Sequence, residues 1–177
     1  MKKTLGGRLM QGYLLGTFDP IHTGHLQMIH HALTKGGCDK VVVIPTRQNP
    51  WKEKQPASYE DRCQMIKNAI LPFGDKCELS YSEMELEPPF YSYKTLERYR
   101  ADGGVIICGT DVAEKIHEWK NYETGIKPYF GVLVIPRGEN DISSTRIREL
   151  IKNGQEIYPL VPETVREYIT IKKLYNG

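Results

Sequence analysis

The sequence has few cysteines, almost no net charge and no long apolar segment. Its cysteines form no CxxC pair, which argues against a zinc site and a dense disulfide framework and indicates buried, reduced thiols at Cys38, Cys63, Cys77 and Cys108. A formal net charge of +2 gives no strong reason to expect nucleic acid or an anionic membrane as a partner. Binding of a small polyanion remains compatible with this charge.

Signals for export and for membrane insertion are also missing. Lys2 and Lys3 resemble the start of a signal peptide, but the stretch TLGGRLMQG that follows is too polar for its apolar region. No segment approaches the length of a membrane-spanning helix. We therefore expect a cytoplasmic protein that binds no membrane.

The order of apolar patterns predicts an α/β fold. Short β-branched runs alternate with helical patterns, which is typical of βαβ units and a parallel sheet. The runs VVVI, VIIC and GVLVI are apolar throughout, as expected of strands covered on both faces. Strands are predicted at 13–17, 40–45, 78–80, 105–108 and 130–135. Helices are predicted at 24–35, 59–70, 92–101, 111–118, 144–152 and 162–173, with Pro162 in the first turn of the last one.

A single domain over residues 1–177 accounts for this pattern, since the chain is long enough to bury a core and shows no internal repeat. The polar segment TRQNPWKEKQPAS, residues 46–58, is a long loop of the kind that is often functional. Loops that follow parallel strands lie at one end of the sheet. Residues after the first, second, fourth and fifth strands are therefore expected to share a cleft.

The segment GTFDPIHTGH, residues 16–25, joins the first strand to the first helix. Gly16 would let a ligand approach the backbone, and a helix N-terminus attracts phosphate through its amides and dipole. His22 and His25 can point at the same anion, with Thr17 adding a hydroxyl. Two other interpretations stay open. One is a plain turn with surface histidines; the other is a metal site, although no nearby cysteine or carboxylate completes a ligand set.

A second helix start with similar chemistry is DISSTRIREL, residues 141–150. Ser143 or Ser144 can cap this helix and leave amides for a phosphate, although an ordinary cap is the alternative. At about 100° per residue, Arg148 returns to within roughly 40° of Ser144, whereas Arg146 lies about 200° away. Arg148 is therefore expected to reach the same anion as the serines, and Arg146 to face solvent.

Together these strings resemble the signature of the nucleotidyltransferase superfamily, with (H/T)xGH after the first strand of a Rossmann-like fold and a second phosphate motif near the end. From about Tyr13 to Tyr175 the chain is most similar to bacterial nicotinate-mononucleotide adenylyltransferases. The segments that carry this resemblance are IPTRQNPWK, SYEDRCQMIKNAI, PFYSYKTL, GTDVAEKIHEW and LVPETVREYITIKKLY. It implies a parallel sheet of about five strands with helices on both faces and a small C-terminal helical part.

The reaction implied by the resemblance is transfer of the adenylyl group of ATP, with Mg²⁺, to nicotinate mononucleotide, which gives deamido-NAD and pyrophosphate. Because the acceptor phosphate is already ionised, it can attack the α-phosphorus without a general base or a covalent protein nucleophile. Alternatives with the same fold use phosphopantetheine or nicotinamide mononucleotide as the acceptor. A different class is a nucleotide sensor without turnover. The oligomeric state is left open, a homo-oligomer included.

Carried over motif by motif, the resemblance implies three groups of site residues. The catalytic residues would be His22, His25 and Arg148. The same three would bind ATP together with Gly16, Thr17, Phe18, Gly109, Asp111, Ile142, Ser143, Ser144 and Thr145. The acceptor would be bound by Lys52, Tyr91, Thr95 and Trp119, and no protein metal site is expected.

Several of these residues also have a purely structural interpretation. Asp111 can cap its helix, Trp119 can be a core aromatic, Tyr91 can pack and Lys52 can face solvent. His30 and His31 are expected at the surface or in packing.

Two further arginines, Arg62 and Arg137, are candidate phosphate ligands that we do not assign to the site. The sequence departs from the family pattern at Leu15, Trp51, Ser92 and Lys94. These departures bear on the pyridine side of the site more than on the ATP side.

Overall fold

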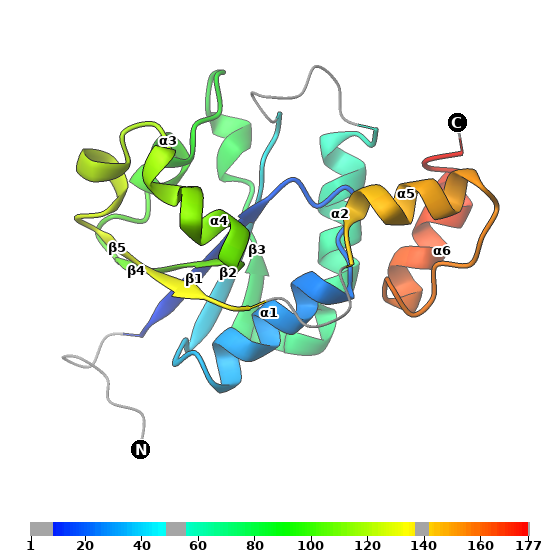
Figure 1. The fold of residues 1–177 in the computed structure, drawn as a ribbon, viewed down its shortest axis with the longest axis horizontal. Coiled ribbons are helices and arrows are strands. Elements are labelled where there is room, and N and C mark those ends of the chain that lie inside the picture. Colours follow the sequence, from blue (N-terminus) through cyan, green and yellow to red (C-terminus); the bar gives the residue numbers. More distant parts are fainter. Residues whose placement is uncertain (1–8, 49–55, 137–141, 177) are drawn as a thin grey trace.

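The computed structural model describes residues 9–48, 56–136 and 142–176. It contains one parallel sheet with the strand order β3-β2-β1-β4-β5 (Figure 1). The strands are β1 (Gln11–Gly16), β2 (Lys40–Pro45), β3 (Cys77–Leu79), β4 (Gly104–Cys108) and β5 (Phe130–Val134). The chain builds outward from β1 to β3 and then crosses back to β4. The direction of winding therefore reverses between β1 and β4, and ligands of such sheets bind at this switch point.

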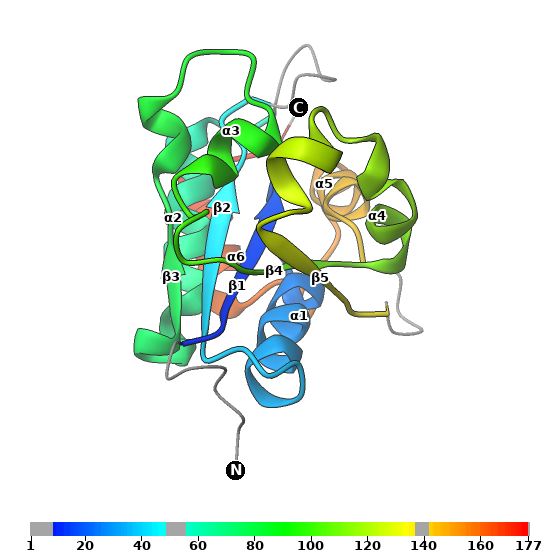
Figure 2. The ribbon, with the colours of Figure 1, turned by 90° about the vertical axis from the view of Figure 1, so that its left-hand side faces the viewer.

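Helices lie on both sides of the sheet (Figures 1 and 2). One side carries α1 (Thr23–Thr34), α2 (Tyr59–Ile70), α5 (Ser144–Lys152) and α6 (Glu163–Lys172). The other side carries α3 (Ser92–Glu97) and α4 (Thr110–Lys115). Helices α5 and α6 form the small C-terminal helical part that the resemblance implies.

Strand residues alternate between two hydrophobic clusters, because successive side chains of a strand point to opposite faces of the sheet. Leu14, Val43 and Ile107 belong to the cluster shared with α1, α2, α5 and α6. Tyr13 and Val42 belong to the cluster shared with α3 and the segment after α4. Both faces are thus buried, which explains the continuously apolar strand sequences.

The predicted fold class is confirmed, and α2 and α5 have the predicted bounds. Three helices are shorter than predicted: α3 ends at Glu97 instead of 101, α4 ends at Lys115 before a 3-10 turn, and α6 loses one residue at each end. After α3 the backbone makes hydrogen bonds between residues three positions apart in place of four. An example is the N–H of Tyr99, which donates to the carbonyl oxygen of Leu96 at 3.0 Å. Pro162 precedes α6 with a ψ of 151°, so it caps the helix and does not lie in its first turn.

Short irregular helices were not predicted from the sequence. In the described residues these are 3-10 helices at Leu71–Lys76, Ser82–Glu85 and Ile116–Glu118, and a π-helix at Tyr122–Ile126. All four cysteines are buried and free, as predicted. Within the described ranges, no helix combines the length and apolar character needed to cross a membrane.

Candidate active site

The two sequence motifs meet at the carboxyl end of β1, beside the switch point of the sheet. Ser144 at the start of α5 donates from Oγ to the carbonyl oxygen of Pro20, at 2.8 Å. Arg148, one turn further along α5, donates from Nη1 to the carbonyl oxygen of Asp19, at 2.7 Å. The β1–α1 turn and the start of α5 are therefore fixed to each other directly.

His22 and His25 lie together at the start of α1. Their rings stack with centroids 3.7 Å apart and planes 29° apart, and His22 is buried. The backbone N–H of His22 donates to Nδ1 of His25, at 3.2 Å. A neutral His25 whose Nδ1 accepts a hydrogen bond carries its proton on Nε2. This tautomer makes Nε2 a hydrogen-bond donor for an anion.

Gly24, which lies between the histidines, packs closely against the His22 ring. A Cβ atom at Gly24 would lie 3.0 Å from Nδ1 and 3.1 Å from Cε1 of His22. A larger residue would therefore crowd the His22 ring and require it to shift by a few tenths of an ångström. This contact gives a packing reason for glycine in the HTGH string.

Gly16 and Phe18 differ from their predicted roles. A Cβ atom at Gly16 would lie 3.0 Å from Cζ of Phe18, so the glycine makes room for this ring. Phe18 has a φ of 51°, and its side chain is buried and packs edge-on against the His25 ring, 4.9 Å between centroids. A nucleotide in the cavity beside the histidines would therefore meet Phe18 through its backbone.

Arg62 on α2 is a structural residue of the site that the sequence did not assign. Its side chain is 1% exposed and donates to the carbonyl oxygens of Thr17, Thr46 and Arg47, at 2.6, 2.8 and 3.0 Å. Desolvation lowers the pKa of the guanidinium, and the charge of Asp19 opposes this shift. Arg62 joins the loops after β1 and β2 from inside the protein, so it is not placed to bind phosphate.

The start of α5 matches the helical-period prediction. Ser143 is the capping residue and accepts from the N–H of Arg146, at 3.2 Å. The side chain of Arg146 is exposed, whereas Arg148 is partly buried and also donates from Nη2 to Oγ1 of Thr145, at 3.2 Å. Ser143 is therefore the cap, and Arg148 is the arginine that faces the β1–α1 turn.

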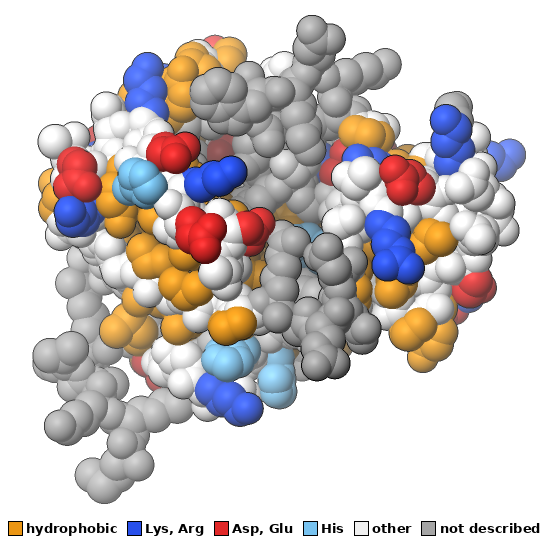
Figure 3. Space-filling model, viewed as in Figure 1, with side chains coloured by type: hydrophobic (Ala, Val, Ile, Leu, Met, Phe, Trp, Pro, Cys, Tyr) orange, Lys and Arg blue, Asp and Glu red, His pale blue; other side chains and the backbone are white. Residues whose placement is uncertain are grey.

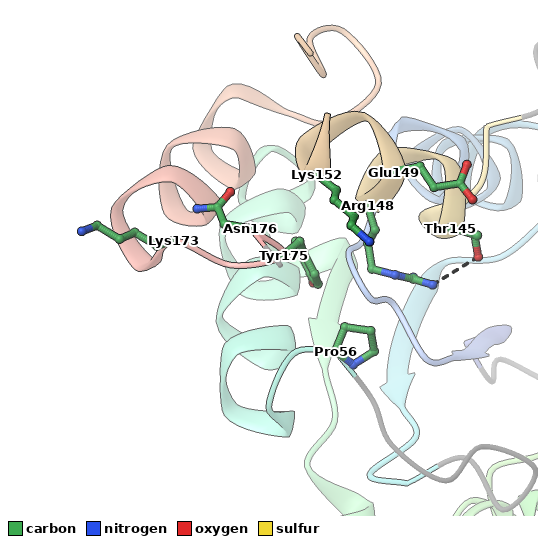
Figure 4. A pocket seen from close by; sticks show the side chains of 8 residues that line it. All are labelled: Pro56, Thr145, Arg148, Glu149, Lys152, Lys173, Tyr175 and Asn176. Carbon is green, nitrogen blue, oxygen red and sulfur yellow. Dashed lines mark hydrogen bonds between the residues drawn. The ribbon is translucent and has the colours of Figure 1, made fainter. Parts of the chain in front are cut away.

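Two cavities flank the start of α5. The first, of about 450 Å³, is lined by His22, His25, Ile142, Ser143 and Ser144, among others. The second, of about 620 Å³, is lined by Thr145, Arg148, Lys152 and Tyr175, among others; in Figure 4, Lys173 points away from the rest. Basic side chains are visible on the surface on this side of the molecule (Figure 3). The first cavity brings together residues of both predicted phosphate motifs.

Residues after β4 lie on the opposite side of the switch point. Gly109 is buried and caps α4, so the predicted alternative of a capping Asp111 is wrong. Asp111 is exposed in the first turn of α4. Trp119 is partly buried and packs against the cluster that contains Tyr13.

Of the predicted acceptor residues, Tyr91 and Thr95 have different environments. Tyr91 is partly buried, stacks with Tyr93 at 6.1 Å between centroids, and has Lys120 Nζ 4.5 Å above its ring. Thr95 is 1% exposed and donates from Oγ1 to Oε1 of the buried Glu83, at 2.8 Å. The Thr95 hydroxyl is therefore buried and bound to Glu83. This corrects the expectation that the Thr95 side chain contacts a substrate.

Lys52, Trp51 and Arg137 lie outside the described residues. Within 9–48, 56–136 and 142–176, no three or more His, Cys, Asp or Glu side chains form a group that could hold a metal ion.

Comparisons with known proteins find similar sequences and a similar fold. A cytidylyltransferase-like family model matches residues 13–150. A protein of Coprothermobacter proteolyticus named probable nicotinate-nucleotide adenylyltransferase is 33% identical and covers 93% of this chain and 94% of its own length. A protein of the same name from Clostridium tetani is 34% identical, with coverage of 89% and 94%.

A solved structure has the same fold. Plasmodium falciparum nicotinic acid mononucleotide adenylyltransferase, complexed with NaAD, superposes with a TM-score of 0.77 over 96% of this chain and 98% of its own. Its sequence identity to this chain is 17%.

Proposed function

The chain belongs to the nicotinate-nucleotide adenylyltransferases of the cytidylyltransferase-like family, and we infer from this membership that it transfers the adenylyl group of ATP to nicotinate mononucleotide. The products are deamido-NAD and pyrophosphate, and the reaction belongs to NAD biosynthesis. A phosphate oxygen of the mononucleotide attacks the α-phosphorus of ATP. The bond from this phosphorus to the bridging oxygen breaks, and pyrophosphate leaves with the electron pair.

The observation that carries this proposal is the stacked pair of His22 and His25 at the start of α1, facing the start of α5. Donors aimed at the reacting phosphate stabilise the charge that develops in the transition state. The Nε2 of His25 is such a donor in the tautomer set by the hydrogen bond from His22 N. We assign the two histidines to the α-phosphate.

Arg148 and the residues around it are assigned to the triphosphate. Arg148 is held by Asp19 O and by Thr145, so its guanidinium is fixed before ATP binds. Ser143, Ser144 and Ile142 line the cavity beside the histidines. Thr17 and Phe18 contribute through the backbone of the β1–α1 turn. Orientation of two reactants in this way can be worth about 7–11 kcal/mol.

The adenosine and acceptor sites are assigned to two groups of residues. One group follows β4, and the other lies just before α3. Gly109 and Asp111 lie just after β4, and the Asp111 carboxylate suits ribose hydroxyls. Trp119 and Tyr91 offer aromatic faces for the pyridine ring. Both are partly buried, so each keeps some surface for a ligand.

Mg²⁺ is proposed to enter with ATP as part of the substrate. Mg²⁺ keeps several water ligands and is often held by substrate phosphates with one or two carboxylates.

Pyrophosphate release by the purified protein with ATP and Mg²⁺ tests the function. Parallel reactions contain nicotinate mononucleotide, nicotinamide mononucleotide or phosphopantetheine at equal concentration. The proposal expects the highest kcat/KM with nicotinate mononucleotide. Preference for another acceptor would overturn the acceptor assignment, and ATP binding without turnover on any acceptor would favour a nucleotide sensor.

A further inference from the structure

The segment after α6 returns to the turn that carries the catalytic histidines. Tyr175 donates its hydroxyl to Oδ1 of Asp19, at 2.6 Å, across 156 positions of sequence. Asp19 is 3% exposed. Burial and the Asp19 carboxylate raise the pKa of the Tyr175 hydroxyl, so the tyrosine remains a protonated donor at neutral pH.

The side chain and the backbone of Asp19 are held by different parts of the chain. Its carboxylate accepts from Tyr175, and its carbonyl accepts from Arg148 Nη1, at 2.7 Å. The next carbonyl, that of Pro20, accepts from Ser144. Tyr175 and Arg148 also line the same cavity (Figure 4). The orientation of Asp19 thus couples the C-terminal segment to Arg148.

The buried carboxylate of Asp19 depends on the hydroxyl of Tyr175 as a hydrogen-bond donor. Its second carboxylate oxygen, Oδ2, is buried and has no hydrogen-bond partner within the described parts of the chain. A buried acceptor left unsatisfied costs about 1–3 kcal/mol, so the carboxylate would turn toward another donor if the Tyr175 hydroxyl were absent. The backbone at Asp19 would then lose one of the contacts that hold it, and the carbonyl of this residue, three residues before His22, fixes Arg148.

We propose that Tyr175 is a positioning residue for adenylyl transfer, which acts by holding Asp19 and thereby the guanidinium of Arg148. The proposal rests on the assignment of Arg148 to the triphosphate. Tyr175 does not touch the reacting atoms. It makes the C-terminal segment part of the active-site framework.

The chain offers a matched control in Tyr168 on α6. Its hydroxyl donates to Oδ1 of Asp61 on α2, at 2.9 Å, which is the same type of pair away from the site. We expect Tyr175→Phe to lower the single-turnover rate about 10- to 100-fold. Tyr168→Phe should keep the wild-type rate. Thermal unfolding midpoints of both variants show whether loss of stability alone explains the result.

A second comparison separates positioning from a general structural effect. Tyr175→Phe is introduced into the Arg148→Lys protein, and single-turnover rates are measured so that slow variants remain accessible. If Tyr175 acts through Arg148, the double variant should be little slower than Arg148→Lys alone. If Tyr175→Phe prevents folding, Tyr175→His keeps a ring N–H that can donate to Asp19 and should retain most of the wild-type rate.

Equal rates for Tyr175→Phe, Tyr168→Phe and wild type would overturn the proposal. It would also be overturned if Tyr175→Phe lowered the rate by the same factor in the wild-type and in the Arg148→Lys protein. Failure of the underlying function is distinguishable, because the wild-type protein itself would then release no pyrophosphate with any acceptor.

Discussion

Arg148 Nη1 lies 2.7 Å from the carbonyl oxygen of Asp19, which joins residues 129 positions apart. This bond fixes the start of α5 to the turn that precedes the two stacked histidines. The two phosphate motifs therefore form one rigid surface, although each begins its own helix. The energetic consequence is that the site is organised before ATP binds.

Arg148→Ala should lower kcat/KM for ATP by about 10²- to 10³-fold, because it removes a preorganised donor. Arg148→Lys should also lose most activity, since an ammonium cannot replace the planar fork that reaches Asp19, Thr145 and a phosphate together. Steady-state kinetics with varied ATP measures this. Arg146→Ala, two residues earlier and exposed, is the matched control and should behave as wild type. Equal losses at the two positions would contradict the assignment.

Gly24→Ala should lower the activity of the protein without lowering its stability. The added Cβ would lie 3.0 Å from the His22 ring and shift it by a few tenths of an ångström, and we expect this shift to lower kcat about tenfold. Alanine is favoured over glycine in a helix by about 1 kcal/mol, so the unfolding midpoint should change little or rise. Kinetics and thermal unfolding of the same sample check both. A fully active Gly24→Ala protein would show that the position of His22 does not matter.

Arg62→Ala should destabilise the fold by more than about 3 kcal/mol, because three buried carbonyl oxygens lose their donor. Urea unfolding measures the free energy of unfolding. The control is Arg166→Ala, which removes a partly exposed arginine paired with Glu163 at the surface and should leave stability essentially unchanged. A small loss for Arg62→Ala would mean that water replaces the guanidinium.

The pH dependence of stability should contain a contribution from Glu83. Burial raises the pKa of its carboxyl above the ordinary 4.5, against opposing hydrogen bonds from Arg47 N and Thr95. The folded state then holds the proton more tightly than the unfolded state. This contribution to stability is therefore fully present below about pH 4.5 and is lost as the pH rises through the folded pKa.

Glu83→Gln should remove this loss, so its free energy of unfolding should fall less than that of wild type as pH rises from about 4 to 8. Urea unfolding at a series of pH values measures the difference. Glu87→Gln, at an exposed position, should keep the wild-type dependence. Identical curves for Glu83→Gln and wild type would exclude the contribution.

The parts of the structure that depend on local pattern were predictable from the sequence. The apolar runs predicted the strands, and the helical period distinguished Arg148 from Arg146. Both follow from periodicities that are set by backbone geometry. The site's association of residues 16–25 with residues 142–148 was expected from the resemblance.

The remaining features depend on contacts between distant residues. No local pattern signals that Arg62 turns inward to three carbonyl oxygens, or that the Thr95 hydroxyl donates to Glu83. Gly16 was expected to make room for a ligand, but the neighbouring Phe18 ring occupies that space because its backbone has a positive φ. The Tyr175–Asp19 bond follows a chain reversal after α6, with Lys173 at a φ of 51°, which no local pattern predicts.

The central claim is that the histidine pair at the start of α1 carries adenylyl transfer from ATP to nicotinate mononucleotide. The most direct measurement is pyrophosphate release by His25→Ala with both substrates, beside His30→Ala as an exposed control on the same helix. The account predicts that His25→Ala loses nearly all turnover, while His30→Ala matches wild type. Unchanged turnover in His25→Ala would contradict it.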